Sequence, residues 1–426
     1  MLVVSSVIGV GIFLTPGAIA ELLPHPGLVL LAWLVGGLLS LAGALANAEL
    51  GAMYPHAGGD YVYLREAYHP AAGFMVGWLS FLVIYTGTVA TLATGFAEGL
   101  GPFLALGPGG RMLVAVAVIA LTTAINYVSV PLGARFNNLT GYLKVATLIG
   151  LGIGGALLGH AHVDATPAAA PVSIASFGLA LSPILFSYLG WNASVYVASE
   201  IRDPDRNVPR SLFVGLAVCT AIYLLTNATY LSALPIDRMR GEARVGEAAA
   251  RVFFGPAGGT IAAVLVLASV LGCLNATILV GPRIAYAMAI DGHFFGRVAR
   301  VHARYRTPHA ALVVQAACAI ALVVVLQRFP RVLDYTTFAI VLATIADTTC
   351  LYRLRRTRPQ ARRPYHAWGY PVVPALYLVA NVAIAAAMLW GRPVECAIAL
   401  GVAATGVPAY AAFARRRTRP GNAASG

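Results

Sequence analysis

The chain has 426 residues, of which 59% are hydrophobic and only 11% are charged, and its formal net charge is +13. So few charged residues cannot cover the surface of a soluble protein of this length, and the composition therefore excludes a water-soluble globular protein. The apolar residues occur in long blocks with polar gaps between them, and about twenty such residues suffice to cross a bilayer as a helix.

Twelve charge-poor blocks of about this length follow one another along the chain, and each is predicted to span the membrane. They cover residues 2–20, 27–48, 72–97, 112–130, 140–159, 174–199, 211–234, 258–282, 309–327, 334–352, 371–391 and 394–413. Because backbone polar groups in lipid must be hydrogen-bonded inside the protein, the blocks predict an all-α integral membrane protein with 12 transmembrane helices.

The positions of the arginines predict the orientation of this bundle. If the N-terminus is cytoplasmic, 20 of the 28 arginines lie in cytoplasmic loops, the adjoining span ends and the C-terminal tail. This bias follows the positive-inside rule, so we expect both termini in the cytoplasm and the chain in the plasma membrane of a bacterium. The basic charge then reflects topology rather than nucleic-acid binding, with contact to anionic lipid as a secondary interpretation. The first block begins at residue 2, which leaves open whether the native start lies upstream.

The first span contains the stretch SSVIGVGIFLTPG, residues 5–17, in which Gly9 and Gly11 flank Val10 and Pro16-Gly17 follows. Each glycine in a helix interior costs about 1 kcal/mol relative to alanine. One interpretation is close packing against a neighbouring helix. The other is a discontinuous helix, whose freed N–H groups face a bound anion.

The fifth span contains Lys144, the only lysine in the chain. It lies about four residues above the predicted cytoplasmic end, roughly 6 Å by helical rise, so its ammonium can snorkel to the interface. The other interpretation is that the ammonium stays inside the protein because some part of the protein needs its charge. The nearby GLGIGG, residues 150–155, has no preceding strand, which favours helix packing over a dinucleotide site.

The sixth span, with the stretch SPILFSYLGWNASVYVASE, places Pro183, Ser187, Gly190 and Asn192 together in mid-membrane. Polar and helix-breaking residues are tolerated there where they line a cavity. Two interrupted helices five spans apart predict two inverted five-helix repeats. We expect these repeats at residues 1–159 and 174–353, followed by two further spans within 371–413 and a cytoplasmic tail at 414–426. One break offers N–H groups for a carboxylate and carbonyls for an ammonium, which fits an α-amino acid.

The remaining residues point away from catalysis. All five cysteines fall within predicted spans and none forms a CxxC pair, so neither a disulfide framework nor a metal site is indicated. The sequence shows no catalytic triad, metal cluster or phosphate-binding loop. We therefore expect neither an enzyme nor a cofactor.

Five stretches resemble the amino acid–polyamine–organocation superfamily, most closely the prokaryotic relatives of the L-type amino acid transporters. They are GVGIFLTPG (9–17), ELGAMYPHAGGDYVYLREAYHPAAGFMVGW (49–78), FSYLGWNASVYVASEIRDPDRNVPRSL (186–212), NATILVGPRIAYAMAIDG (275–292) and PYHAWGYPVVPAL (364–376). The resemblance extends over essentially the whole chain. It implies two inverted five-helix repeats plus two extra helices, with broken helices one and six, that work by alternating access.

The resemblance also implies roles for residues of both breaks. Gly9, Val10 and Gly11 would present backbone donors to the substrate carboxylate, although many relatives have a small polar residue where this chain has Val10. Phe186 matches the aromatic residue that closes over bound substrate. The backbone from Phe186 through Ser187 to Tyr188 would accept the α-ammonium, while Gly190 belongs to the break and Asn192 matches a polar lining residue.

For Lys144 the resemblance implies a specific alternative to snorkelling. In relatives that do not use sodium, a lysine of span five can occupy the place of a bound cation. Its ammonium would bond carbonyls near Val7 and Ile8, together with polar groups of span eight such as Ser269 or Cys273. Its proton could then be coupled to transport, or its charge could simply be fixed.

The central layer otherwise has almost no formal charge, so a neutral amino acid is the expected substrate and the carrier is expected to be a sodium-independent exchanger or proton-coupled permease. A basic amino acid or polyamine antiporter is the alternative, since aromatic faces also hold cations. A membrane sensor that binds amino acids without transporting them is a further alternative. The loop at 98–111 has no cysteine, so we expect no disulfide-linked glycoprotein subunit.

Overall fold

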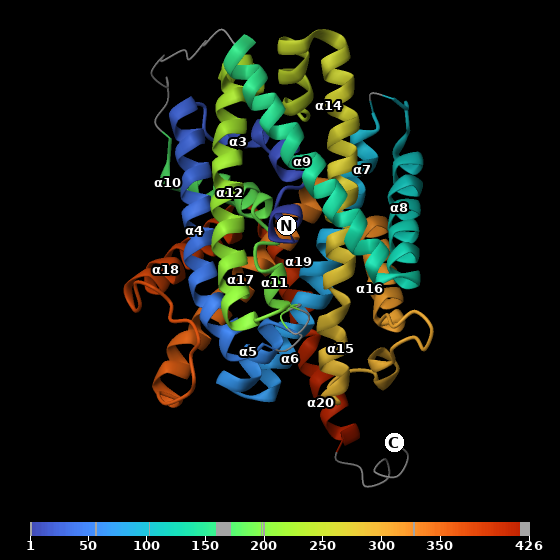
Figure 1. Ribbon diagram of the computed structural model, residues 1–426, viewed down its shortest axis with the longest axis vertical. Coiled ribbons are helices and arrows are strands. Elements are labelled where there is room, and N and C mark those ends of the chain that lie inside the picture. Colours follow the sequence, from blue (N-terminus) through green and yellow to red (C-terminus); the bar gives the residue numbers. More distant parts are fainter. Residues whose placement is uncertain are drawn as a thin grey trace.

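The structure is a computed structural model that describes residues 2–55, 58–101, 103–158, 172–196, 198, 201–326 and 329–417. Most of the predicted tail at 414–426, and the last residue of the predicted first repeat, lie outside these ranges. Every regular element in the described part is a helix, and no strand occurs there. Figure 1 shows the long helices running side by side along the vertical axis of the molecule.

The helices of the first half alternate between long spans and short segments. They are α1 (Leu2–Val7), α2 (Gly11–Leu14), α3 (Pro16–Leu22), α4 (Pro26–Met53), α5 (Asp60–Ala67), α6 (Pro70–Leu79), the π-helix η1 (Ser80–Tyr85), α7 (Thr86–Gly99), α8 (Pro108–Val128) and α9 (Val130–Leu158).

The second half contains α14, the longest helical element described, which is kinked at Gly255 where φ is 70°. Its elements are α10 (Ile174–Ser187), α11 (Ala193–Tyr196), α12 (Pro204–Ala233), α13 (Ile236–Met239), α14 (Val245–Val280), α15 (Pro282–Ile290), the short 3₁₀ helix η3 (Gly296–Ala299), α16 (His309–Leu326), α17 (Phe329–Thr357), α18 (Val372–Gly391), α19 (Pro393–Ala404) and α20 (Gly406–Arg417).

The predicted all-α membrane fold is confirmed. Among the described residues, nine helical segments are long and apolar enough to cross a membrane, and the bent pair Val3–Leu14 and Pro16–Leu22 makes a tenth. The segments Ile174–Ser187 and His309–Val325 are apolar but shorter. Since two of the twelve expected spans correspond to helices below spanning length, the count of twelve and the inverted repeats stay predictions.

Proline sets the beginning of many of these helices. Its fixed φ suits the first turn, and the N–H that it lacks would have had no partner there. The helices that begin at a proline are α3, α4, α6, α8, α12, α15 and α19. His25 and His69 precede two of these prolines and accept hydrogen bonds from the amides of Gly27 and Ala71, which caps α4 and α6.

The two interrupted segments lie at the centre of the bundle. α1 packs against α9, α12 and α14, while α10 packs against α4, α17 and α18. Figure 1 accordingly places the N-terminus in the middle of the molecule rather than at one end. Long helices therefore surround both breaks, which restricts access to them.

One end of the bundle, the lower end in Figure 1, carries α5, α6 and the end of α17. Its arginines pair with acids of other helices: Arg355 lies 2.6 Å and Arg363 3.3 Å from Glu49, and Arg358 lies 3.1 Å from Glu66. We call this the arginine-rich end. Its ion pairs join α4, α5 and the segment after α17.

Candidate functional site

The first predicted break is present in the structure. α1 ends at Val7 and α2 begins at Gly11, so residues 8–10 are not helical. A second change of direction follows, because Val3–Leu14 and Pro16–Leu22 are bent by 58°. The amides of Phe13 and Leu14 donate to Val10 O, but the first two amides of α2, those of Gly11 and Ile12, have no helical carbonyl within reach, and Val10 provides no side-chain cap. These amides are thus free to bind something other than their own helix.

The second predicted break is also present, because α10 ends at Ser187 and α11 begins only at Ala193. Gly190 lies between them with φ of 98°, a conformation that L residues rarely adopt. A Cβ atom on Gly190 would lie 2.9 Å from Ser6 of α1. The turn between α10 and α11 therefore needs glycine both for its conformation and for its contact with α1.

A cavity lies where the two breaks meet. Its empty volume is about 590 Å³, the part open to solvent included. Its lining comes from the first break and α2 (Ser6, Val7, Gly9, Val10, Gly11), η1 and α7 (Ile84, Tyr85, Thr88, Leu92), α10 and the second break (Phe186, Ser187, Leu189, Gly190, Asn192, Ala193) and α14 (Cys273, Ala276, Thr277, Val280).

No Asp, Glu, Lys, Arg or His is among the described residues that line this cavity. Its polar groups are hydroxyls, one thiol, one amide and the backbone of the breaks. Apolar surface comes from side chains such as Leu92 and Ile84. Such a lining can accommodate a molecule whose own charges cancel, and it offers no counter-ion to a charged side chain.

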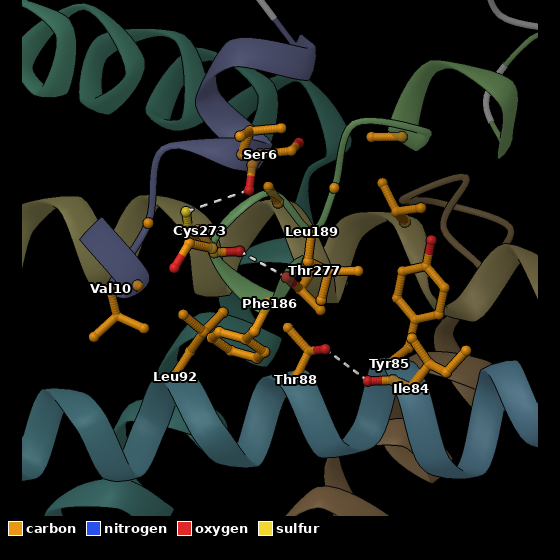
Figure 2. A pocket seen from close by; sticks show the side chains of 18 of the residues that line it. Ser6, Val10, Ile84, Tyr85, Thr88, Leu92, Phe186, Leu189, Cys273 and Thr277 are labelled. Atoms are coloured by element: carbon orange, nitrogen blue, oxygen red, sulfur yellow. Dashed lines mark hydrogen bonds between the residues drawn. The ribbon is translucent and has the colours of Figure 1, made fainter. Parts of the chain in front are cut away.

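Phe186 projects into the middle of the cavity. Figure 2 shows its ring beside Leu92 and Thr88 of α7, which lies across the cavity from the second break. The side chain is 5% exposed. The ring therefore forms part of the cavity wall.

Gly11 is required because α2 lies directly against the end of α10. A Cβ atom on Gly11 would lie 2.2 Å from Ser187 Oγ and 2.7 Å from Ser187 Cα. A backbone atom cannot rotate away, so even alanine would force the two breaks apart. Thr15 reinforces the contact, since its Oγ1 donates to Gly11 O at 2.8 Å and lies 3.3 Å from Ser187 Oγ.

Tyr223 of α12 hydrogen-bonds to both breaks, and no sequence pattern had indicated this residue. Its hydroxyl oxygen lies 2.8 Å from the carbonyl oxygen of Val7 and 2.8 Å from that of Ser187. These carbonyls lie at the ends of α1 and α10, where helical partners are absent. The ring packs edge-on against Trp33 and Tyr188, which fixes the hydroxyl in place.

Lys144 lies behind the cavity and does not reach the membrane surface. It is 1% exposed, and its Nζ donates to Ser5 O at 2.8 Å and lies 3.0 Å from Cys273 Sγ. The thiol in turn lies 3.1 Å from the carbonyl oxygen of Ile8. The ammonium of α9 thus connects to α1 directly and through α14, and Cys273 separates it from the cavity.

Besides Lys144, three predicted site residues lie outside the cavity lining. The Ile8 side chain is fully buried in the core, and the hydroxyl of Tyr188 donates to Trp33 O at 3.2 Å. Ser269 is buried, and its hydroxyl has no partner among the described residues. The predicted contacts of Lys144 with the carbonyls of Val7 and Ile8 are replaced by the contact with Ser5, because Tyr223 and Cys273 occupy those two carbonyls.

The other predicted site residues, from both breaks and from α14, come together around the cavity. They are Val7, Gly9, Val10, Gly11, Phe186, Ser187, Gly190, Asn192 and Cys273.

Span three forms one wall of the cavity, which the sequence analysis missed. η1 has π-helical geometry, which is rare and frequent at functional sites. Ile84, Tyr85, Thr88 and Leu92 face the cavity from η1 and α7. The threonine-rich run TGTVATLATG at 86–95 was the available indication, but Thr88 donates to Ile84 O within its own segment at 2.7 Å. Threonines in apolar helices are often satisfied in this way, so the pattern alone is weak.

Comparison with known proteins finds similarity to amino acid permeases, transporters and exchangers. A family model described as "Amino acid permease" matches residues 1–408. The serine/threonine exchanger SteT of Bacillus subtilis is 28% identical over 421 residues, which cover 98% of this chain and 95% of that protein. Human "large neutral amino acids transporter small subunit 2" is 29% identical, with 96% of this chain and 78% of that protein covered. Human "Asc-type amino acid transporter 1" is 27% identical, with 98% and 80% covered.

Proposed function

The chain belongs to the amino acid permease family, and from this premise we propose that it exchanges neutral amino acids across the plasma membrane by alternating access, without sodium. It is a multi-pass membrane transporter of amino acids and not an enzyme. The neutral substrate, the exchange mechanism and the independence of sodium are the proposed parts.

The observation that carries the proposal is the uncharged cavity at the meeting point of the two helix breaks. Free amides at the start of α2 suit a carboxylate, and backbone carbonyls at the end of a broken helix suit an ammonium, although Tyr223 already bonds those of Val7 and Ser187. These two groups are common to all α-amino acids. Since the described lining has no ionised side chain, the side chain of the substrate is expected to be neutral.

The relatives support a neutral substrate. One is named for serine and threonine, and another for large neutral amino acids. A basic amino acid or a polyamine remains the alternative, but the cavity offers only the rings of Tyr85 and Phe186 to such a cation. Because no carboxylate is among the described lining residues, this alternative is the weaker one.

Lys144 supports the independence of sodium. Its Nζ already donates to a carbonyl of the first broken helix, a group that a bound cation would otherwise coordinate. A fixed ammonium in this position leaves sodium no vacant place.

Further proposals are that the arginine-rich end is cytoplasmic and that lipid contacts the outer helices. We also propose that the chain works without a disulfide-linked subunit, since residues 98–111 contain no cysteine.

The test uses purified protein in liposomes loaded with an unlabelled neutral amino acid, with labelled amino acid outside. We expect uptake that requires internal amino acid and is unchanged when sodium is replaced by choline. Binding without uptake would instead support a membrane sensor. Uptake into empty liposomes only with sodium would contradict both exchange and sodium independence.

A further inference from the structure

Two buried carboxyl groups lie outside the cavity and have no part in the proposed substrate site. Asp60 begins α5 and is 3% exposed, and Asp347 lies in α17 and is 1% exposed. α5 packs against α17, and the pKa of Asp60 is affected by a side-chain contact with Asp347. One oxygen of each, Oδ1, has no hydrogen-bond partner among the described residues. A proton between the two groups would satisfy both oxygens at once.

Among the described residues, none that faces the pair carries a positive charge. The titratable groups that face it from the neighbouring helices are neutral phenols and a thiol, namely Tyr63 of α5, Tyr85 of η1, Tyr196 of α11, Cys350 of α17 and Tyr377 of α18. No ion pair joins either carboxyl to a basic side chain in the described ranges. On α4, the charge of Glu49 is instead matched by Arg355 and Arg363.

Two polar side chains beside the pair each have one atom without a partner. Asn47 of α4 is 3% exposed and Tyr63 is fully buried, and neither Asn47 Oδ1 nor the Tyr63 hydroxyl has a partner in the described part of the chain. Two ionised carboxylates in contact inside a protein repel each other strongly, so such pairs retain one proton. Burial raises the pKa of Asp60, although its hydrogen bonds with Tyr196 and Asp347 act in the opposite direction.

A chain of contacts joins this pair to the substrate cavity. Tyr196 donates its hydroxyl to Asp60 Oδ2 at 2.5 Å, and Asn192, which lines the cavity, donates to the Tyr196 hydroxyl at 3.5 Å. The ring of Tyr85, another lining residue, packs edge-on against Tyr196 at 5.5 Å. Figure 1 places α11 between the centre of the bundle and α5 at the arginine-rich end. The pair therefore lies beyond the cavity on the way to that end.

The beginning of α5 is pressed directly against Tyr196. Gly59 has φ of 48°, and a Cβ atom there would lie 2.5 Å from the Tyr196 ring. A path from the cavity that opened past Tyr196 would separate α5 from α11. That separation would break the bond between Tyr196 and Asp60 and would admit water to the pair.

We propose that Asp60 and Asp347 form a proton-binding site that holds one proton while the pathway is closed toward the arginine-rich end. When that pathway opens, water hydrates both carboxylates and the proton passes to the solvent. A lower pH at this end therefore favours the closed state, and a higher pH favours opening. This inference rests on the proposed transport function for its coupling to substrate, but the proton site itself can be tested without transport.

The first experiment compares infrared spectra of the purified wild-type protein and the double variant Asp60→Asn/Asp347→Asn at neutral pH, in H₂O and D₂O. We expect the wild type to show a deuterium-sensitive carbonyl band of a protonated carboxyl group that the double variant lacks. The single variant Asp347→Asn provides the comparison if the double variant does not fold. Asp237→Asn, whose parent side chain is 83% exposed, is the control and should change no such band. If the spectra of the wild type and the double variant differ only in the bands of ionised carboxylates, the proposal is overturned.

The second experiment measures thermal stability against pH in detergent. A carboxyl whose pKa is raised on folding binds more protons in the folded state, so stability falls as pH rises above the ordinary value of 3.8. We expect this fall in the wild type and a flatter profile in the double variant, with Asp237→Asn behaving as wild type. A rise in stability with added sodium that the double variant loses would assign the pair to a metal cation instead and would overturn the proton site.

The third experiment tests coupling in liposomes. The exchange rate should fall with lower pH at the arginine-rich end, at most about tenfold per pH unit for a one-proton step, and should be insensitive to pH in the double variant. The same pH dependence in the double variant would refute the coupling. If the protein transports nothing, the infrared and stability results still decide whether the proton site exists, so the two failures are distinguishable.

Discussion

Replacement of Lys144 by alanine tests the role of the single buried ammonium. The Ser5 carbonyl would lose a donor at 2.8 Å, and the Cys273 thiol would lose a neighbour at 3.0 Å. Because Cys273 Sγ stays 3.4 Å from the same carbonyl, the expected cost is that of one lost hydrogen bond from a charged donor, about 1–3 kcal/mol. A free-energy change of this size shifts a conformational equilibrium about 5- to 150-fold. The free-energy difference between inward-open and outward-open states is of similar size. We therefore expect Lys144→Ala to change turnover and sidedness while the protein still folds.

Lys144→Arg separates a buried ammonium from a general need for positive charge. The site is closely packed, since a Cβ atom on Gly272 would lie 3.1 Å from Lys144 Cε. The larger planar guanidinium does not reproduce a compact ammonium, so arginine should not restore full activity. Arg135, an exposed cation on the same helix, provides the control, and Arg135→Ala should be nearly silent.

The assay is exchange in liposomes of known sidedness, in sodium and in choline, with equal amounts of inserted protein. Lys144→Ala should lose most of the turnover in both salts, and Lys144→Arg should remain well below wild type. Full activity of both variants would refute the assigned role and would leave the lysine without a function in transport.

Three further substitutions test the breaks. Phe186→Ala should weaken the apparent affinity for substrate about ten- to a hundredfold with normal insertion, since burying a phenylalanine side chain contributes about 1.5–3 kcal/mol, and unchanged exchange kinetics would contradict this. Gly11→Leu should abolish binding, whereas Gly150→Ala, with no atom within 4 Å of the added Cβ, should retain wild-type affinity. Tyr223→Phe should lower thermal stability and slow exchange by removing the hydroxyl shared by the two breaks. Tyr230→Phe on the same helix should do neither, because its hydroxyl has no partner in the described structure.

The positions of the two breaks could be predicted because glycine and proline affect the backbone locally. Gly9, Gly11 and Gly190 weaken a helix wherever it packs, and the structure is non-helical at or beside each of them. The same effect explains why the count of spans could not be established. The break in the sixth block leaves α10 too short to count as a span, although the block is long and apolar in sequence.

Contacts between helices could not be read from the sequence. Lys144 was predicted to bond carbonyls near Val7 and Ile8, but it donates to the carbonyl of Ser5. Which carbonyl of α1 faces the lysine depends on how α1 is rotated against α9 and α12. Tyr223 went unnoticed because an aromatic residue in an apolar span is usually part of the core. The wall formed by η1 was also missed, since a π-helix changes which face of span three meets the cavity.

The most direct test of the central claim is a counterflow screen of the twenty amino acids with the purified protein in liposomes. The uncharged cavity between the breaks predicts that neutral amino acids drive uptake of a labelled neutral amino acid equally well in sodium and in choline. It also predicts that arginine, lysine, aspartate and glutamate do not. Counterflow driven only by charged amino acids, or by none of the twenty, would contradict the assignment of this cavity as a site for neutral amino acids.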